Sequence, residues 1–253
     1  LYGALVALAI YQSLTFFVTL TLTYKASWFK LRYLLGGIDK QSAKNLAKFT
    51  VMALTSAACV PLSHILIRNH LGETLGWEAA GYWEAMWRLS AAYLMLVTTT
   101  LSVYYLPKLS ELQDTGDIKK EILQGYKIIL PVAAACGLVI YLLRDFIIRV
   151  LFTAEFAEME VLFGWQMVGD TLKIGSWMLA YLMLGKAMVK LFILSEIGFA
   201  ASFYGLTYYF TSVLGLEGVS VAHAVNYFFY WVLMAVFIGI YFSMKSTESV
   251  YSR

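Results

Sequence analysis

The side chains that could do chemistry in this chain are concentrated in two segments, and the first reads FGWQMVGDTLKIGSW over residues 163–177. On a helix that turns about 100° per residue, Gln166, Asp170, Lys173 and Trp177 fall on one narrow face, which Gly169 borders. Asp170 and Lys173 are three residues apart and can neutralise each other. The face is interpreted either as the charged wall of a central cavity or as a self-compensating pair packed against a neighbouring helix.

The second segment reads GYWEAMWRLSAAYL over residues 81–94. Its spacing places Glu84 and Arg88 on one helix face and Trp83 and Trp87 on the adjacent stripe. Arginine binds phosphate oxygens through two parallel hydrogen bonds, so Arg88 is a candidate phosphate ligand, and neutralisation of Glu84 alone is the alternative. Trp and Tyr near a membrane interface are expected as an aromatic belt, so Trp83 alone indicates little.

Other reactive residue types predict no metal site and no cofactor. The three histidines lack metal-ligand spacing, and a proton-relay role for His64 or His223 stays open. Cys59 and Cys136 lie inside apolar blocks and are predicted to be packing residues. The chain has no Walker-type glycine loop, no G-x-S-x-G and no Mg²⁺-binding carboxylate cluster, which argues against an ATPase, a hydrolase and a glycosyltransferase. We therefore expect no catalytic activity.

The elements that carry these residues are predicted to be membrane-spanning helices. The chain has 253 residues, of which 60% are hydrophobic and only 14% charged, against about a quarter charged in soluble domains. The apolar residues form seven blocks of about the length that crosses a bilayer. The blocks are Leu1–Tyr24, Leu46–Ile67, Ala79–Leu106, Ile128–Leu143, Val161–Gly185, Leu191–Leu214 and Val219–Ser243, and the fourth could run from Tyr126 to Val150.

The basic residues predict an orientation. When the connections between the seven spans are assigned alternately to the two sides of the membrane, fourteen Lys and Arg residues lie on one side and three on the other. Arg88 and Lys173 lie inside spans. Cytoplasmic loops of membrane proteins are enriched in Lys and Arg. The side with fourteen, which includes the linker 25–48 and the tail 244–253, is therefore predicted to be cytoplasmic. The net charge of +3 is small and predicts no nucleic-acid partner.

The two ends of the chain carry a weak internal repeat. LYGALVALAIY at residues 1–11 matches LEGVSVAHAVN at residues 216–226 at Leu, Gly, Val, Ala and Ala positions. Chance and a real repeat of about 215 residues are both open, since apolar helices often match by accident. If the repeat is real, the first block would be the last helix of one unit, and the next six blocks would form a second unit. The chain also begins within an apolar run, so we expect it to be a fragment of a longer protein.

Five segments in this order resemble the C-terminal part of Wzx-type flippases, which belong to the multidrug/oligosaccharidyl-lipid/polysaccharide exporter superfamily. The segments are KFTVMAL at 48–54, GYWEAMWRLSAAYL at 81–94, LSVYYLPKLSEL at 101–112, YLLRDF at 141–146 and WQMVGDTLKIG at 165–175. The resemblance implies an all-α integral membrane protein with two six-helix lobes around a central cavity, as in MATE transporters. Residues 1–24 would be the last helix of the N-lobe, and residues 49–243 the six-helix C-lobe.

The resemblance also implies a function. Such proteins move an undecaprenyl-pyrophosphate-linked oligosaccharide, an O-antigen or common-antigen unit, across the bacterial inner membrane by alternating access. A polysaccharide polymerase and a chain-length regulator would be further partners, besides membrane lipid. Arg88 and Lys173 would attract the pyrophosphate, and Gln166, Trp83, Trp87 and Trp177 would contact the sugars.

The chain departs from the family pattern at one position. The family often carries an Asp after the Ser of the second segment, and here that position is Ala91. A coupling role for that carboxylate cannot be carried over, so Asp170 or Glu84 is the candidate. A drug/cation antiporter on the same fold and a membrane-embedded enzyme of polysaccharide assembly remain the alternatives. The first would need an acidic, aromatic cavity, and the second a long external loop.

Overall fold

The computed structural model describes residues 2–27, 29–30, 37 and 39–251. Leu1, Arg32 and Arg253, which belong to the predicted first span and to the basic side, lie outside the described residues. The chain divides into two compact units, Leu1–Leu46 and Ala47–Arg253. The first unit contains the apolar helix α1 (Tyr2–Lys25), which ends at the first lysine of the basic linker.

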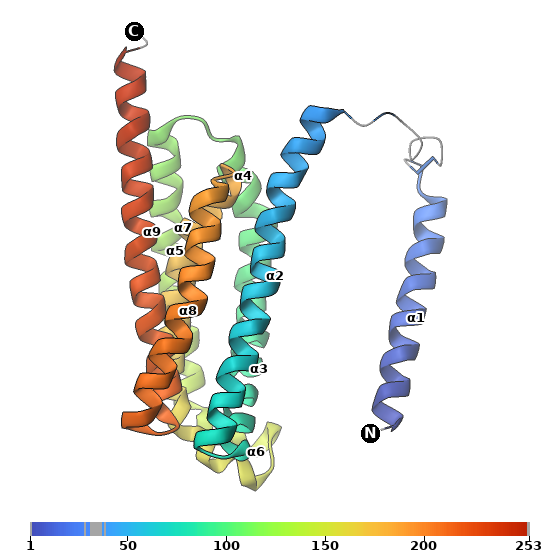
Figure 1. The fold of residues 1–253 in the computed structure, drawn as a ribbon, viewed down its shortest axis with the longest axis vertical. Helices are drawn as coiled ribbons and strands as arrows, with labels where there is room; N and C mark the ends of the chain where they lie inside the picture. Colours follow the sequence, from blue (N-terminus) through green and yellow to red (C-terminus); the bar gives the residue numbers. More distant parts are fainter. Residues whose placement is uncertain (1, 28, 31–36, 38, 252–253) are drawn as a thin grey trace. The chain divides into compact units, whose positions relative to one another are not determined.

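The second unit is a helical bundle (Figure 1), and the described residues of the whole chain contain no strand. Its long helices are α2 (Lys40–Thr74), which begins before the unit boundary, α3 (Trp77–Thr100), α5 (Thr115–Leu142), α7 (Phe163–Gly185), α8 (Val189–Leu214) and α9 (Glu217–Tyr251). Shorter elements connect them: a π-helical turn η2 (Leu101–Tyr105), α4 (Leu106–Glu111), α6 (Arg144–Leu151) and a 3-10 segment η3 (Ala154–Leu162).

Local residue types explain where several helices end. Asp114 caps α5, because its carboxylate accepts hydrogen bonds from the backbone N–H groups of Gly116 at 2.7 Å and Asp117 at 3.1 Å. Gly76, between α2 and α3, has φ 95°, and Gly215, after α8, has φ 61°. Glycine adopts positive φ without the steric penalty that a Cβ brings, so both tight reversals are built on it.

The helices extend beyond the predicted apolar blocks. The predicted connection Pro107–Lys127 is largely helical, since α4 continues to Glu111 and α5 begins at Thr115. Hydropathy marks only the segment inside the bilayer, whereas a capped polar turn can continue the same helix in water. At the other end of α5 the helix breaks at Leu143, and the residues up to Leu151 form the separate helix α6.

Six helical segments among the described residues are long and apolar enough to cross a membrane, and α7 is not one of them. The six are Leu5–Lys25, Lys40–Thr74, Trp77–Glu111, Thr115–Leu142, Val189–Leu214 and Glu217–Lys245. α7, the predicted fifth span, has 23 residues and thus sufficient length. Its hydropathy is lowered by Gln166, Asp170 and Lys173, and all three are buried inside the unit. The chain is therefore an all-α integral membrane protein in which α7 is shielded by its neighbours.

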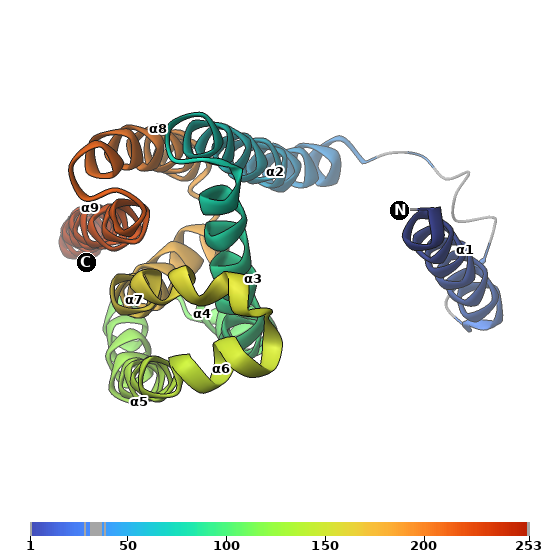
Figure 2. The same ribbon diagram turned by 90° about the horizontal axis from the view of Figure 1, so that it is seen from below.

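The core of the second unit is organised around α7, which packs against α9 and α5 and also contacts α3, α4 and α8 (Figure 2). One half of α7 lies in an apolar cluster with α4, α5 and α9 that includes Leu109, Ile118, Met178 and Met234. The other half lies in a second cluster with α2, α3 and η3. Between the two clusters, α7 carries its polar face.

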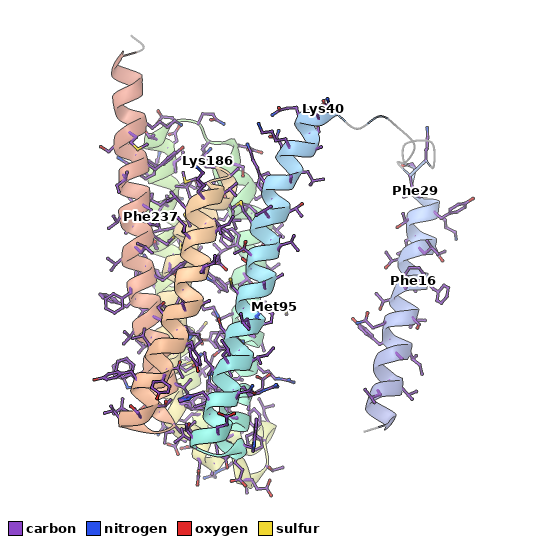
Figure 3. The ribbon with its side chains drawn as sticks, in the orientation of Figure 1. Phe16, Phe29, Lys40, Met95, Lys186 and Phe237 are labelled. Atoms are coloured by element: carbon purple, nitrogen blue, oxygen red, sulfur yellow. The ribbon has the colours of Figure 1, made fainter. Side chains whose placement is uncertain are left out.

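The two ends of the second unit differ in charge. Lys186, shown in Figure 3, donates to the backbone carbonyls of Ser110 and Leu112, and Lys245 donates to that of Gln113. This lysine-rich end contains α4 and the C-terminal end of α9, whereas α6 lies at the opposite end (Figure 1). There, Arg144 Nε donates to Glu160 Oε1 at 2.9 Å.

Candidate functional site: a buried polar cluster

Asp170 of α7 is the centre of a buried polar cluster. Its Oδ2 accepts a hydrogen bond from the hydroxyl of Tyr93 on α3 at 2.6 Å. Its Oδ1 lies 3.0 Å from Nε2 of His223 on α9 and accepts from Nε2 of Gln166 at 3.3 Å. The side chains of Asp170 and His223 are each 1% exposed. Three helices thus place their polar groups on one carboxylate that water does not reach.

Gly169 allows α9 to approach α7 closely enough for this contact. A Cβ at that position would lie 3.0 Å from Nε2 of His223 and 3.1 Å from the backbone nitrogen of Ala224, and it would overlap Cδ2 of His223. Small residues at helix interfaces in membranes let backbones come together and bring polar side chains within hydrogen-bonding distance. The glycine that borders the predicted polar face is therefore a structural requirement of the Asp170–His223 contact.

Gln166 connects the carboxylate to α3. Its amide nitrogen also donates to Ser90 Oγ at 3.2 Å, and both side chains are buried. A buried amide needs partners for its donors, because an unsatisfied polar group in an apolar interior is costly. Ser90 and Asp170 together hold Gln166 in one orientation.

Lys173 is surrounded by aromatic rings. Its Nζ lies 4.6 Å from the ring centre of Trp87, 4.8 Å from Trp177 and 5.5 Å from Tyr227. The faces of aromatic rings attract a cation within about 6 Å, and more strongly where water is absent. The sequence suggested mutual neutralisation of Asp170 and Lys173. In the described residues, His223 makes the direct contact with Asp170, and the ammonium of Lys173, which is close enough to interact electrostatically with Asp170, lies among the three rings.

The predicted tryptophans of α3 pack around a histidine of α2. The ring centre of His64 lies 4.2 Å from that of Trp87 and 5.2 Å from that of Trp83. Trp83 is 1% exposed. Nε2 of His64 and Nδ1 of His223 are buried with no hydrogen-bond partner among the described residues. Both nitrogens are therefore available to a proton or a hydrogen-bonding ligand.

Arg88 and Glu84 do not join the cluster. Nε of Arg88 lies 3.0 Å from Oε1 of Glu84 in the same helix, and the Arg88 side chain is 78% exposed. Of the predicted site residues, the structure thus brings together Gln166, Asp170, Lys173, Trp83, Trp87 and Trp177, and it leaves Arg88 and Glu84 on the surface of α3.

Sequence reasoning missed three members of the cluster, Tyr93, Ser90 and Tyr227, and gave His223 only an open relay role. The signal for His223 was its position inside an apolar block, where an ionisable residue is expensive. For the tyrosines no comparable signal exists, because the chain has 18 of them.

The cluster gathers several ionisable groups in the interior of the bundle. It combines a carboxylate, an imidazole with an unoccupied Nδ1 and an ammonium in a water-excluded interior, where charges interact strongly. The described residues contain no group of three or more His, Cys, Asp or Glu that could hold a metal ion. Charge or proton occupancy at Asp170 would change the contacts among α3, α7 and α9 together.

Comparison with known proteins finds both close relatives in sequence and a family. The chain is 34% identical over 231 residues to the lipid III flippase of Escherichia coli (strain K12) and to that of Shigella flexneri. The aligned region covers 91% of this chain and 56% of each relative, so the chain spans about half the length of the curated relatives it matches. No solved structure matches it. Residues 2–161 match the model of the polysaccharide biosynthesis protein family, and this chain is a member of that family.

Proposed function

We propose that this chain is the C-terminal part of a flippase that moves an undecaprenyl-pyrophosphate-linked oligosaccharide across the bacterial inner membrane by alternating access. The family membership and the likeness to lipid III flippases support this proposal. Residues 1–24 would be the last helix of an N-lobe, residues 25–48 a cytoplasmic linker, residues 49–243 a six-helix C-lobe and residues 244–253 a cytoplasmic tail. A polymerase and a chain-length regulator would act on the product.

The single observation that carries the proposal is the burial of Asp170, His223 and Lys173 between apolar helices. Ionisable groups inside a membrane protein are expensive, roughly 2.5–3.5 kcal/mol each on insertion scales, and usually mark transport pathways or proton relays. Asp170 contacts three helices at once. A change in its charge would therefore bias the packing of the lobe, which a rocking transporter requires.

The exposure of the predicted residues separates their proposed roles. Arg88 is accessible and would attract the pyrophosphate directly, with Glu84 as its resting partner. Asp170 would couple transport to a proton or cation gradient through His223. Lys173, Gln166, Trp83, Trp87 and Trp177 would contact substrate only in a conformation that opens the cluster.

An antiporter remains the second candidate because of a pocket of about 300 Å³ lined by α2, α3, α7, α8 and α9. It contains the carboxylate of Glu196, which accepts a hydrogen bond from Ser56 at 2.9 Å, and six aromatic residues, Trp177, Tyr181, Phe192, Phe199, Tyr227 and Tyr230. An acid among aromatic rings suits an organic cation. Trp177 and Tyr227 also surround the ammonium of Lys173, and its charge would repel such a ligand, which favours the flippase.

Surface display of enterobacterial common antigen in a strain that lacks its lipid III flippase tests the proposal. The full-length gene that contains this sequence should restore display, and Asp170→Asn and Arg88→Ala should abolish or strongly reduce it at equal protein level. Glu73→Gln, which removes an exposed carboxylate near the end of α2, is the matched control and should restore display fully. Failure of the unaltered gene, together with increased resistance to organic cations, would favour the antiporter.

A further inference from the structure

A groove on the second unit, away from the buried cluster, has the features of a lipid site. It lies between α5 and α7, holds about 950 Å³ and extends to Arg144, Glu160 and Glu217 at the α6 end of the unit. Its apolar lining includes the residues Leu138, Val161, Trp165 and Val168, which are 44–58% exposed.

The dimensions of the groove match one leaflet of a bilayer. Its lining follows α7 from Gly164 to Leu172, about 12 Å at 1.5 Å per residue. Half of the hydrocarbon core is about 15 Å thick. Gly137 and Gly164 line the groove without side chains of their own, and a Cβ at Gly164 would meet Tyr141 Cε2 at an ordinary 3.7 Å. An apolar groove of this length has room for a lipid chain.

The charges at the end of the groove select the headgroup. Arg144 contributes one positive charge, and Glu160 and Glu217 contribute two negative charges. Within the described residues, Arg144 uses Nε for Glu160 and Nη1 for the carbonyl of Tyr141, which leaves Nη2 for an external acceptor. The Glu160 side chain is 46% exposed, and Glu217 is exposed in the first turn of α9.

We propose that this groove binds one zwitterionic aminophospholipid, with an acyl chain between α5 and α7, the phosphate on Arg144 and the ammonium on Glu160 and Glu217. A headgroup with a phosphate alone would be repelled by the two carboxylates, whereas a primary ammonium can donate three hydrogen bonds to them. Tyr141 and Trp165 lie beside the headgroup end, where amphipathic rings are favoured at the membrane interface. The proposal does not depend on the flippase function.

Lipid titration followed by native mass spectrometry tests the site on the protein in detergent. The probes are phosphatidylethanolamine, phosphatidylglycerol and phosphatidylcholine. One phosphatidylethanolamine should bind at a concentration about tenfold lower than phosphatidylglycerol, because charge-assisted hydrogen bonds to the ammonium are lost with the latter. The double variant E160Q/E217Q should remove that preference, and Arg144→Ala should weaken binding of all three lipids.

Substitutions of two adjacent residues in α5 test the location of the site, because only one of the two would fill the groove. Ala134 lines the groove, and Ala135 is the next residue of α5, also exposed but outside the lining. Ala134→Phe should abolish the tightly bound lipid, and Ala135→Phe should retain it. Equal behaviour of these two variants, or equal binding of phosphatidylglycerol and phosphatidylethanolamine, would overturn the proposal. So would a groove that retains a polyprenyl phosphate in preference to phosphatidylethanolamine.

Discussion

Nε2 of His223 lies 3.0 Å from Oδ1 of Asp170, and this contact joins α9 to α7 in the interior of the bundle. A buried pair of this kind is stabilised by its mutual attraction only while both partners are present. Tyr93 and Gln166 supply further hydrogen bonds to the same carboxylate. The pair is therefore tied to the positions of α3, α7 and α9.

Removal of the carboxylate should destabilise the bundle. Asp170→Ala leaves the polar atoms of Tyr93, Gln166 and His223 without their acceptor, and we expect a loss of about 3–5 kcal/mol in the free energy of unfolding. Asp170→Asn keeps the shape and one acceptor oxygen and should cost about 1–3 kcal/mol. Unfolding in detergent followed by circular dichroism measures both. The exposed substitution Glu73→Gln should change stability by less than about 0.5 kcal/mol, and equal effects of the three would contradict the assigned geometry.

A methyl group at Gly169 should separate α7 from α9. The Cβ of Gly169→Ala would overlap His223, so we expect a loss of about 1–3 kcal/mol by overpacking together with a loss of activity. Gly81 of α3 is the matched control, because a Cβ there meets no atom within 4 Å. Gly81→Ala should stabilise the protein by about 0.4–1 kcal/mol through the lower entropy of the unfolded chain. The comparison uses the same unfolding assay, and a tolerated Gly169→Ala would show that the helices are farther apart.

Replacement of Lys173 should separate stability from transport. Lys173→Met removes a buried charge but keeps a flexible apolar chain among Trp87, Trp177 and Tyr227. We expect a change in stability of no more than about 2 kcal/mol, because the attraction between the ammonium and the three rings is lost while the cost of burying the ammonium is removed. Transport, measured as antigen display, should be lost. If Lys173→Met instead unfolds the protein and Lys173→Arg restores both properties, the aromatic rings and the cation serve structure alone.

Labelling of single cysteines should show the predicted orientation. In a variant without Cys59 and Cys136, Ser110→Cys at the lysine-rich end should react with a membrane-impermeant maleimide only after the cells are lysed. Thr153→Cys, between α6 and η3, should react in intact spheroplasts. The expectation follows from the excess of Lys and Arg on the side of Ser110. The reverse pattern would invert the proposed topology.

The membrane class and the polar face of α7 could be predicted from the sequence because both depend on local patterns. Apolar blocks of bilayer length indicate spans, and helical periodicity alone places Gln166, Asp170 and Lys173 on one face, which the structure buries. The predicted ends of the helices were less accurate than the predicted spans. Asp114 starts α5 before its apolar block, and such a capped polar turn leaves no trace in hydropathy.

The partners of that face could not be predicted, because they depend on how helices distant in sequence rotate toward one another. Lys173 is three residues from Asp170, and an ion pair between them was the local expectation. The structure pairs Asp170 with His223, which is 53 residues away, and it places Lys173 among rings from α3, α7 and α9. Helix packing determines these additional contacts, and they cannot be predicted from the residue types of Asp170 and Lys173.

The shielding of α7 also has a consequence for biogenesis. At the centre of a lone helix, Asp and Lys each oppose insertion by about 2.5–3.5 kcal/mol on the translocon scale. α7 is thus a poor substrate for release into lipid by itself, and His223, which contacts the Asp170 carboxylate, is synthesised only with α9. We infer that α7 stays at the translocon, or in contact with α3 and α5, until α9 emerges. The synthesis of α9 would then allow the complete bundle to leave the translocon and enter the bilayer.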